Sequence, residues 1–233
     1  MRFLTVRFSA PLMALQGPRI DGEPQSLPIP TRSLITGMFG SALGFGREDH
    51  EKLQALQDNM HVAVVVHRNG VEINDYQIAD LGKPHMRGPM WSSGTTTAER
   101  EGSQIEGLRQ QQRPYRADAD MTAIVEMRVG SLIPAEQILA ALDQPVHPLF
   151  MGRTSCPPAS RLAGHIFDAP SLEVATLQVA RHNAGEIYLP ADAATPSWGD
   201  LPLSIPGRRD WASFCHAGSD LYVVRQRPPS APA

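Results

Sequence analysis

Four segments of the chain have the hydrophobic pattern of β-strands. Met1–Phe8 alternates apolar and polar positions, which is typical of a strand with one buried face. Met60–Val66 is almost continuously apolar, which predicts a central strand buried on both faces. Val71–Ile78 alternates again and follows Asn69-Gly70, a strong hairpin signal, so we expect it to pair with Met60–Val66. Met121–Val129 predicts the next strand.

The segment from Pro30 to Gly44 has the pattern of an amphipathic helix. Apolar pairs recur every four residues along it and would form one face. Thr31 is a suitable N-cap, and Gly44 is a suitable stop. Gly37 and Gly40 lie inside the helix, where each costs about 1 kcal/mol relative to alanine, on the side opposite the apolar pairs. We therefore expect a bulky group to approach that second side closely.

The order of elements predicts an α+β fold. Glu48–Gln57 and Pro134–Leu142 are further helices, which completes a ferredoxin-like or RNA-recognition-type pattern with an insertion. Short apolar segments beyond residue 147 predict strands of a small C-terminal β domain: Leu172–Val179, Glu186–Leu189, Leu203–Ile205 and Leu221–Val224. We expect a ferredoxin-like domain at 1–147, a turn-rich loop and small β domain at 148–227, and a disordered tail at 228–233.

A long polar segment interrupts this order between Leu81 and Tyr115. It has almost no periodicity and exceeds an ordinary loop in length, so it is either functional or a mobile insertion with no role. Its basic side chains outnumber its acidic ones in a chain whose net charge is −3. The basic residues are Lys83, Arg87, Arg100, Arg109 and Arg113, with Arg116 directly after the segment.

Composition indicates the class of protein and its cellular setting. Apolar residues at 42% and charged residues at 19% describe a soluble globular protein with no run long enough to span a membrane. The two cysteines lie far apart and indicate a reducing, cytoplasmic setting. The net charge of −3 argues against a globally basic nucleic-acid-binding protein. Of the 21 basic residues, all but Lys52 and Lys83 are arginines. Arginine suits bidentate phosphate contacts and base stacking, although a GC-rich coding bias explains the same preference.

The candidate chemistry is limited. The histidines are scattered without metal-ligand spacing, and the glycines fit neither a P-loop nor a dinucleotide fingerprint, so we expect no metal and no cofactor. Ser155-Cys156 lacks a base nearby in the sequence and favours a structural role. Lys83 and His85 could supply the cation and the base of metal-free RNA cleavage; the alternative is that both are ordinary members of a polar loop.

Two spaced elements resemble the Cas-five family of CRISPR-associated proteins, part of the RAMP superfamily. The first is Pro30-Thr31-Arg32-Ser33 with the glycines that follow it. The second, Pro148 to Pro157, is similar to the Pro-Tyr-Leu-Gly-Arg-Arg-Ser-Cys-Pro element of the subtype I-E branch. Arg113-Pro114-Tyr115-Arg116-Ala117-Asp118 is similar to that branch's Arg-Glu-Tyr-Leu-Cys-Asp. The resemblance covers residues 1 to about 160 and continues loosely near Arg209-Asp210-Trp211.

The resemblance implies a fold, a function and a set of partners. The fold is an RNA-recognition-type domain with a long β-hairpin thumb, here about 81–116, and a small C-terminal β domain. The function is that of a non-catalytic subunit of the type I-E Cascade complex, which holds the 5′ handle of the CRISPR RNA and caps the backbone filament in antiviral defence. The partners are the CRISPR RNA, the CasC backbone subunit, the large CasA subunit and, through the complex, target DNA.

The resemblance, together with the basic segment, also suggests RNA-binding residues. They are Arg32, Ser33, Gly37, Gly40, Lys83, Arg87, Arg109, Arg113, Tyr115, Arg116, Met151, Gly152, Arg153, Thr154, Ser155 and Cys156. Arginines would bind phosphates, while Tyr115 or Met151 would contact bases, each with a core position as its alternative. The chain departs from the family at Leu15, where an aromatic residue is typical, and at Thr154, which replaces a second arginine.

Two other functions stay open at this point. The first is a metal-independent endoribonuclease that processes precursor CRISPR RNA through Lys83 and His85, because a subtype I-C relative cuts RNA. The second is a ferredoxin-like protein that binds a small molecule and no nucleic acid. RNA cleavage in EDTA and salt-dependent RNA affinity separate these functions.

Overall fold

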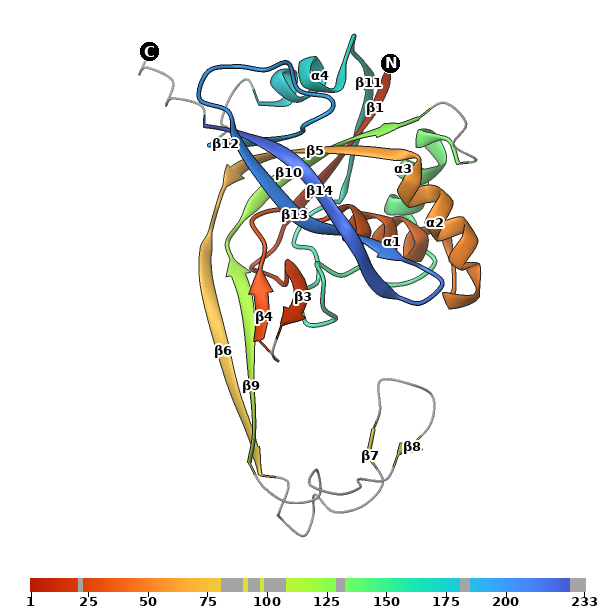
Figure 1. Cartoon of the computed structure of the whole chain (residues 1–233). Helices are drawn as coiled ribbons and strands as arrows, with labels where there is room; N and C mark the ends of the chain where they lie inside the picture. The colour runs from red at the N-terminus through yellow and green to blue at the C-terminus, as the bar shows by residue number, and fades with distance from the viewer. Residues whose placement is uncertain are drawn as a thin grey trace.

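A seven-stranded antiparallel sheet forms the centre of the protein in a computed structural model, which describes residues 1–20, 23–80, 90–91, 97–98, 108–128, 133–180 and 185–226. The strand order is β11-β1-β10-β5-β12-β14-β13, and every neighbouring pair is antiparallel. The strands are β1 (Arg2–Ser9), β5 (Met60–Arg68), β10 (Asp120–Met127), β11 (Ala163–Asp168), β12 (Glu186–Pro190), β13 (Leu201–Asp210) and β14 (Cys215–Gln226). The fold is therefore mixed α/β, with few helices around a large sheet (Figure 1).

Helices pack on both faces of this sheet. On the first face lie α1 (Arg32–Leu43), α2 (His50–Asp58), which follows the short 3-10 helix η1 (Arg47–Asp49), and α3 (Ala135–Asp143); α4 (Leu172–Val179) covers the second. The central strand β5 sends Val62 and Val64 into the first core and Ala63 and Val65 into the second. This confirms the prediction that the continuous apolar run is buried on both sides. Within the described residues, no helix is long and apolar enough to cross a membrane.

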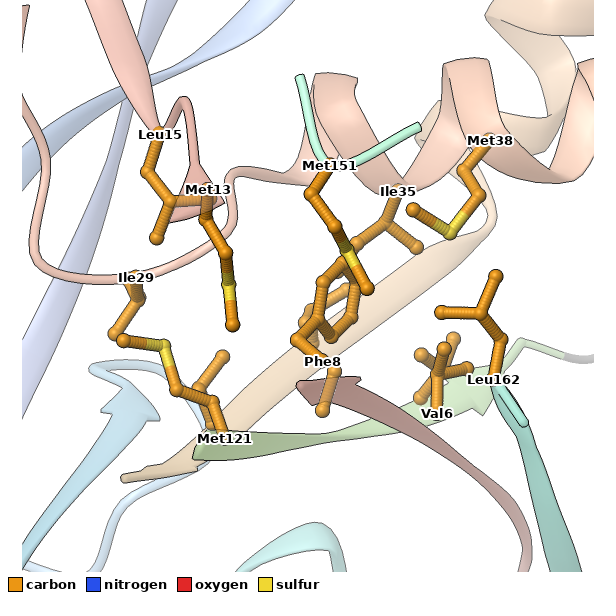
Figure 2. Packing of buried hydrophobic residues seen from close by; sticks show 14 of the residues in the cluster. Val6, Phe8, Met13, Leu15, Ile29, Ile35, Met38, Met121, Met151 and Leu162 are labelled. Atoms are coloured by element: carbon orange, nitrogen blue, oxygen red, sulfur yellow. The ribbon is translucent and has the colours of Figure 1, made fainter. Parts of the chain in front are cut away.

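The first core joins α1 to the sheet. Phe8 of β1 and Ile35 of α1 are fully buried there, and Met151 reaches the same core from the loop before β11 (Figure 2). Thr31 caps α1 through its side-chain oxygen, which accepts a hydrogen bond from the Leu34 backbone, and Gly44 ends the helix in the left-handed conformation at φ 82°. Both predicted helix ends are confirmed.

The predicted pairing of Val71–Ile78 with Met60–Val66 is wrong. Strand β6 (Val71–Asp80) instead pairs along its whole length with β9 (Leu108–Ala117), and β2 (Leu12–Met13) completes this three-stranded sheet. The turn residue Gly70 has φ 71°, and a Cβ there would lie 2.2 Å from the Ala117 carbonyl oxygen. The turn therefore sends the chain out of the main sheet and along β9. The β6–β9 ladder projects from the body of the protein (Figure 1).

The region after residue 147 also differs from expectation. Leu172–Val179, predicted as a strand, is helix α4, because the Ser171 side chain caps it by accepting from the Val174 backbone and its apolar side chains pack on the sheet. Strands β12, β14 and β13 extend the main sheet beyond β5. Strands from before and after residue 147 therefore belong to one sheet. The division into two domains at residue 147 stays a prediction.

The remaining strands are short. β3 (Gln16–Ile20) pairs with β4 (Glu23–Ser26), and β7 (Met90–Trp91) pairs with β8 (Thr97–Ala98). The β3–β4 hairpin begins directly after the segment that contacts the Met151 loop, because the Ala14 backbone donates to the Met151 carbonyl at 2.9 Å. These contacts fix the position of Gln16, which contributes to the site described below.

Candidate functional site

An open groove of about 480 Å³ lies where four parts of the chain meet. The first wall is α1, the second is the loop 148–154, and the third is the β13–β14 hairpin; Ala14, Gln16 and Gly17, around the start of β3, complete the lining. Among the described residues that line it, the only basic side chains are those of Arg153, Arg209 and His216, and none is acidic. The charged side chains of this lining are therefore all basic, in a protein whose net charge is −3, and this charge favours an anion.

The α1 wall contributes Ser33 and Gly37, both predicted as site residues. The Thr31 and Ser33 hydroxyls lie 3.1 Å apart at the start of the helix. Arg32 points elsewhere: it is 7% exposed, and its guanidinium pairs with the Asp220 carboxylate of β14 at 2.9 Å. The RNA contact predicted for Arg32 is corrected to a buried ion pair that joins α1 to the sheet.

Gly37 and Gly40 have different neighbours. A Cβ on Gly37 would lie 3.4 Å from the indole ring of Trp211, whereas a Cβ on Gly40 would lie 2.4 Å from Leu53 Cδ2 of α2. The bulky groups that approach this side of α1 therefore belong to the same chain. Gly40 is buried, so the predicted RNA contact is corrected to a close helix–helix approach for this residue.

The loop 148–157 folds back on itself. The Met151 backbone donates to the Cys156 carbonyl at 2.7 Å, and Gly152 has φ 91° with its Cα against the Ala14 carbonyl, where a Cβ would lie only 2.1 Å from the oxygen. Only glycine fits this conformation and this approach. Thr154 lines the groove beside Gly152.

The other predicted members of this loop lie outside the groove wall. Met151 is fully buried and Cys156 is 1% exposed, so both predicted RNA contacts are corrected to core packing. Ser155 is exposed on the turn. The free thiol of Cys156 is buried, in agreement with the structural role favoured above.

Arg153 is held in place on two sides. Its guanidinium donates to the Gln16 side-chain oxygen at 2.8 Å and lies 5.1 Å from the centre of the Tyr115 ring. Its other terminal nitrogen, Nη1, is buried and has no hydrogen-bond partner. Burial raises the pKa of Tyr115, but interactions with Arg153 and Ser155 outweigh it and the net pKa is lowered. Tyr115 is thus a buried platform under Arg153, and its predicted stacking on a base is corrected accordingly.

The third wall consists of residues that were not predicted. Arg209 lies over the indole of Trp211 at 5.5 Å, and its buried Nε has no hydrogen-bond partner. His216 lines the same wall, and its pKa is lowered by burial and by the charge of Arg209. In the sequence, Arg209 and Trp211 belong only to a loose continuation of the family resemblance. No sequence pattern indicates that residues 33 and 209 line the same groove.

The basic residues of the predicted thumb lie away from this groove or outside the described residues. In β9, Arg113 donates to Gln111, and Arg116 donates to the Asn69 side chain at 2.9 Å. Arg109 belongs to β9, but its side chain is outside the described part of the chain. Lys83, His85, Arg87 and Arg100 lie outside the described residues.

Comparison with known proteins identifies the family. A family model described as "CRISPR-associated protein (Cas_Cas5)" matches residues 3–194. The chain is therefore a CRISPR-associated protein. Within that class, it belongs to the Cas5 family, the Cas-five family that the two motifs resemble.

Individual relatives agree with this family. The Cascade subunit CasD of the CRISPR system of Escherichia coli (strain K12) is 26% identical over 158 residues, which is 66% of this chain and 66% of the relative. A chain of a solved CRISPR RNA-guided surveillance complex superposes with a TM-score of 0.68 at 20% identity, covering 96% of this chain and 89% of that one. A crystal structure of a Cas protein gives a TM-score of 0.58 at 19% identity, covering 97% and 93%. The superpositions show the same fold.

Proposed function

We propose that this protein is a non-catalytic subunit of a type I-E Cascade surveillance complex, holding the 5′ handle of the CRISPR RNA and capping the backbone filament in the cytoplasm. The observation that carries the proposal is the groove, which has arginines and no acidic side chain among its described lining residues. Arginine donors bind phosphates and apolar surfaces contact unpaired bases, and the groove offers both.

The fold supports the same proposal. The strand order β11-β1-β10-β5, with α1 after β1 and α3 after β10, is that of a ferredoxin-like domain. The β6–β9 ladder is the candidate for the thumb, and it starts at Val71 instead of Leu81. In this assignment the ladder would reach over the guide toward the CasC subunit, the CasA subunit would dock nearby, and target DNA would be bound through the complex.

RNA binding by the full chain tests the proposal. The probe is a labelled single-stranded RNA with the repeat-derived 5′ end of the host's CRISPR RNA. We expect salt-dependent binding that weakens about tenfold in Arg153→Gln, because one charge-assisted contact is lost. Arg2→Gln removes the same charge at an exposed position outside the groove, paired with Glu136, and should bind like the parent. No RNA affinity, alone or with the neighbouring subunits, would refute the proposal.

The same RNA tests the enzymatic alternative. Incubation in EDTA should leave the RNA intact if the subunit is non-catalytic. Site-specific cleavage that disappears in Lys83→Ala or His85→Ala would replace the proposal with a metal-independent endoribonuclease.

A further inference from the structure

We propose that the C-terminal β13–β14 hairpin forms one half of the RNA site, with Arg209 binding a backbone phosphate opposite Arg153 and an unpaired nucleotide lying between them. The proposal rests on the proposed function and assigns new residues to it. The substrate class is single-stranded RNA, because the open groove of about 480 Å³ is lined by two arginines together with apolar side chains.

The position of Arg209 is fixed by its backbone. The Arg209 amide donates to the side-chain oxygen of Gln57 in α2 at 3.1 Å, and the Gln57 side-chain nitrogen donates to the Arg209 carbonyl at 2.8 Å. Gln57 is 2% exposed and also accepts from the Trp211 indole at 3.2 Å. The hairpin wall is therefore rigid before any ligand binds, which lowers the entropy lost on binding.

The guanidinium of Arg209 is left without an anion. Arg7, Arg32, Arg161, Arg208 and Arg225 each pair with a carboxylate. Arg153 and Arg209 pair with no carboxylate among the described residues. Each also has a buried guanidinium nitrogen without a hydrogen-bond partner. A buried unsatisfied donor costs about 1–3 kcal/mol. Both arginines are half-buried and line the groove, so the accessible part of each guanidinium is available to a phosphate.

The floor of the groove suits a base. Phe150 and Leu34 are half-buried and line the groove, whereas Trp211 is 5% exposed and supports Arg209 from beneath. Apolar and aromatic surface between two cations is the arrangement that holds an unpaired nucleotide by stacking and phosphate contacts together. A small anion would need the cations alone.

Affinity for the labelled single-stranded RNA tests this assignment. We expect Arg209→Gln to weaken binding about tenfold, the loss of one charge-assisted contact, and to reduce the slope of log K against log salt by about 0.7. Arg209→Lys should keep the slope and lose part of the affinity, because the planar donor fork is lost but the charge stays. Arg2→Gln is the charge-matched control and should match the parent. Inorganic phosphate as competitor should displace the RNA only weakly.

The outcomes separate this inference from the proposed function. If Arg153→Gln weakens binding while Arg209→Gln and Arg209→Lys bind like the parent with the parent's salt slope, the hairpin assignment is wrong and the function stands. If the parent protein binds no RNA, both are wrong. Should Arg209→Gln lower the melting temperature, the lysine variant decides, and parental affinity in that variant overturns the inference.

Discussion

Gly37 and Gly40 lie on the same side of α1, but their surroundings differ. A Cβ on Gly37 would lie at ordinary contact distance from the Trp211 ring. A Cβ on Gly40 would overlap the Leu53 Cδ2 methyl, which would have to move. Both glycines lower the intrinsic stability of the helix by about 1 kcal/mol each. Only at Gly40 does packing compensate for this cost.

Alanine substitutions should therefore have opposite effects at the two positions. Gly37→Ala should raise the free energy of unfolding by about 0.5–1 kcal/mol, because the helix gains propensity without a clash. Gly40→Ala should lower it by about 1 kcal/mol, because overpacking against Leu53 exceeds the gain in propensity. Urea denaturation measures both.

A second background tests the physical cause. In Leu53→Ala, the group that blocks Gly40 is absent, so adding Gly40→Ala should now stabilise the protein. If Gly40→Ala destabilises both backgrounds equally, the close contact with Leu53 is not the reason for this glycine.

The start of α1 depends on a buried ion network. Asp220 of β14 accepts from Arg32 at 2.9 Å and from Arg208 at 2.8 Å. Removing Asp220 leaves the buried Arg32 guanidinium without a carboxylate, which costs about 3 kcal/mol, whereas removing Arg32 leaves Asp220 paired with Arg208 and costs less. Arg32 therefore acts on the groove through the position of α1.

Stability and RNA binding should separate the two arginines of the family motifs. Asp220→Asn should lower the free energy of unfolding by about 3 kcal/mol, and Arg32→Gln by a smaller amount, about 1–2 kcal/mol, because Asp220 keeps Arg208. Arg153→Gln should change it by less than about 1 kcal/mol, because Arg153 pairs with no carboxylate among the described residues. Thermal unfolding measures this difference. A stable Arg32→Gln variant that fails to bind RNA would return Arg32 to the list of direct contacts.

Helix α4 is attached to the sheet by Arg225. Its guanidinium pairs with Glu173 of α4 and, at 2.7 Å, with Asp200 before β13. Interaction with Arg225 lowers the pKa of Asp200. Burial raises the pKa of Glu173, but hydrogen bonds from Thr195 and Arg225 outweigh this effect, so the net pKa is lowered. The ion pairs of Arg225 with Glu173 and Asp200 are therefore lost when these carboxyls are protonated in acid.

Arg225→Gln should therefore destabilise the protein in a pH-dependent way. A carboxyl whose folded pKa is lowered contributes stability above its unfolded pKa of about 4 and loses it as the pH falls through the folded value. The loss relative to the parent should be largest near pH 7 and should shrink below about pH 4. Arg161→Gln breaks an exposed pair with Asp143 and serves as the control. A pH-independent difference would contradict this.

The sequence predicted those elements whose signals are local. The cap at Thr31, the stop at Gly44 and the central strand β5 all follow from residues within one segment. Helix α4 was missed because three of its eight residues, Val174, Thr176 and Val179, are β-branched and favour strands, and its N-cap Ser171 follows a proline. The partner of β6 was missed because Asn69-Gly70 predicts a turn without specifying which strand receives the chain.

At the scale of the whole molecule, the groove could be predicted only in part. Ser33, Gly152 and Arg153 carried family motifs and do meet in space. Arg209, Trp211 and His216 come from a hairpin more than 170 residues after Ser33 in the chain. The side chain of Gln57 holds this hairpin in place. Such a long-range contact leaves no periodicity or spacing in the sequence.

Photo-crosslinking tests most directly whether this groove holds RNA. The full chain is bound to the single-stranded RNA carrying 4-thiouridine, irradiated and digested, and the crosslinked peptides are identified by mass spectrometry. We predict adducts on the loop around Phe150–Arg153 and on the hairpin around Trp211–His216, which line the two sides of the groove. Adducts confined to α4, which covers the other face of the sheet, would contradict the central claim.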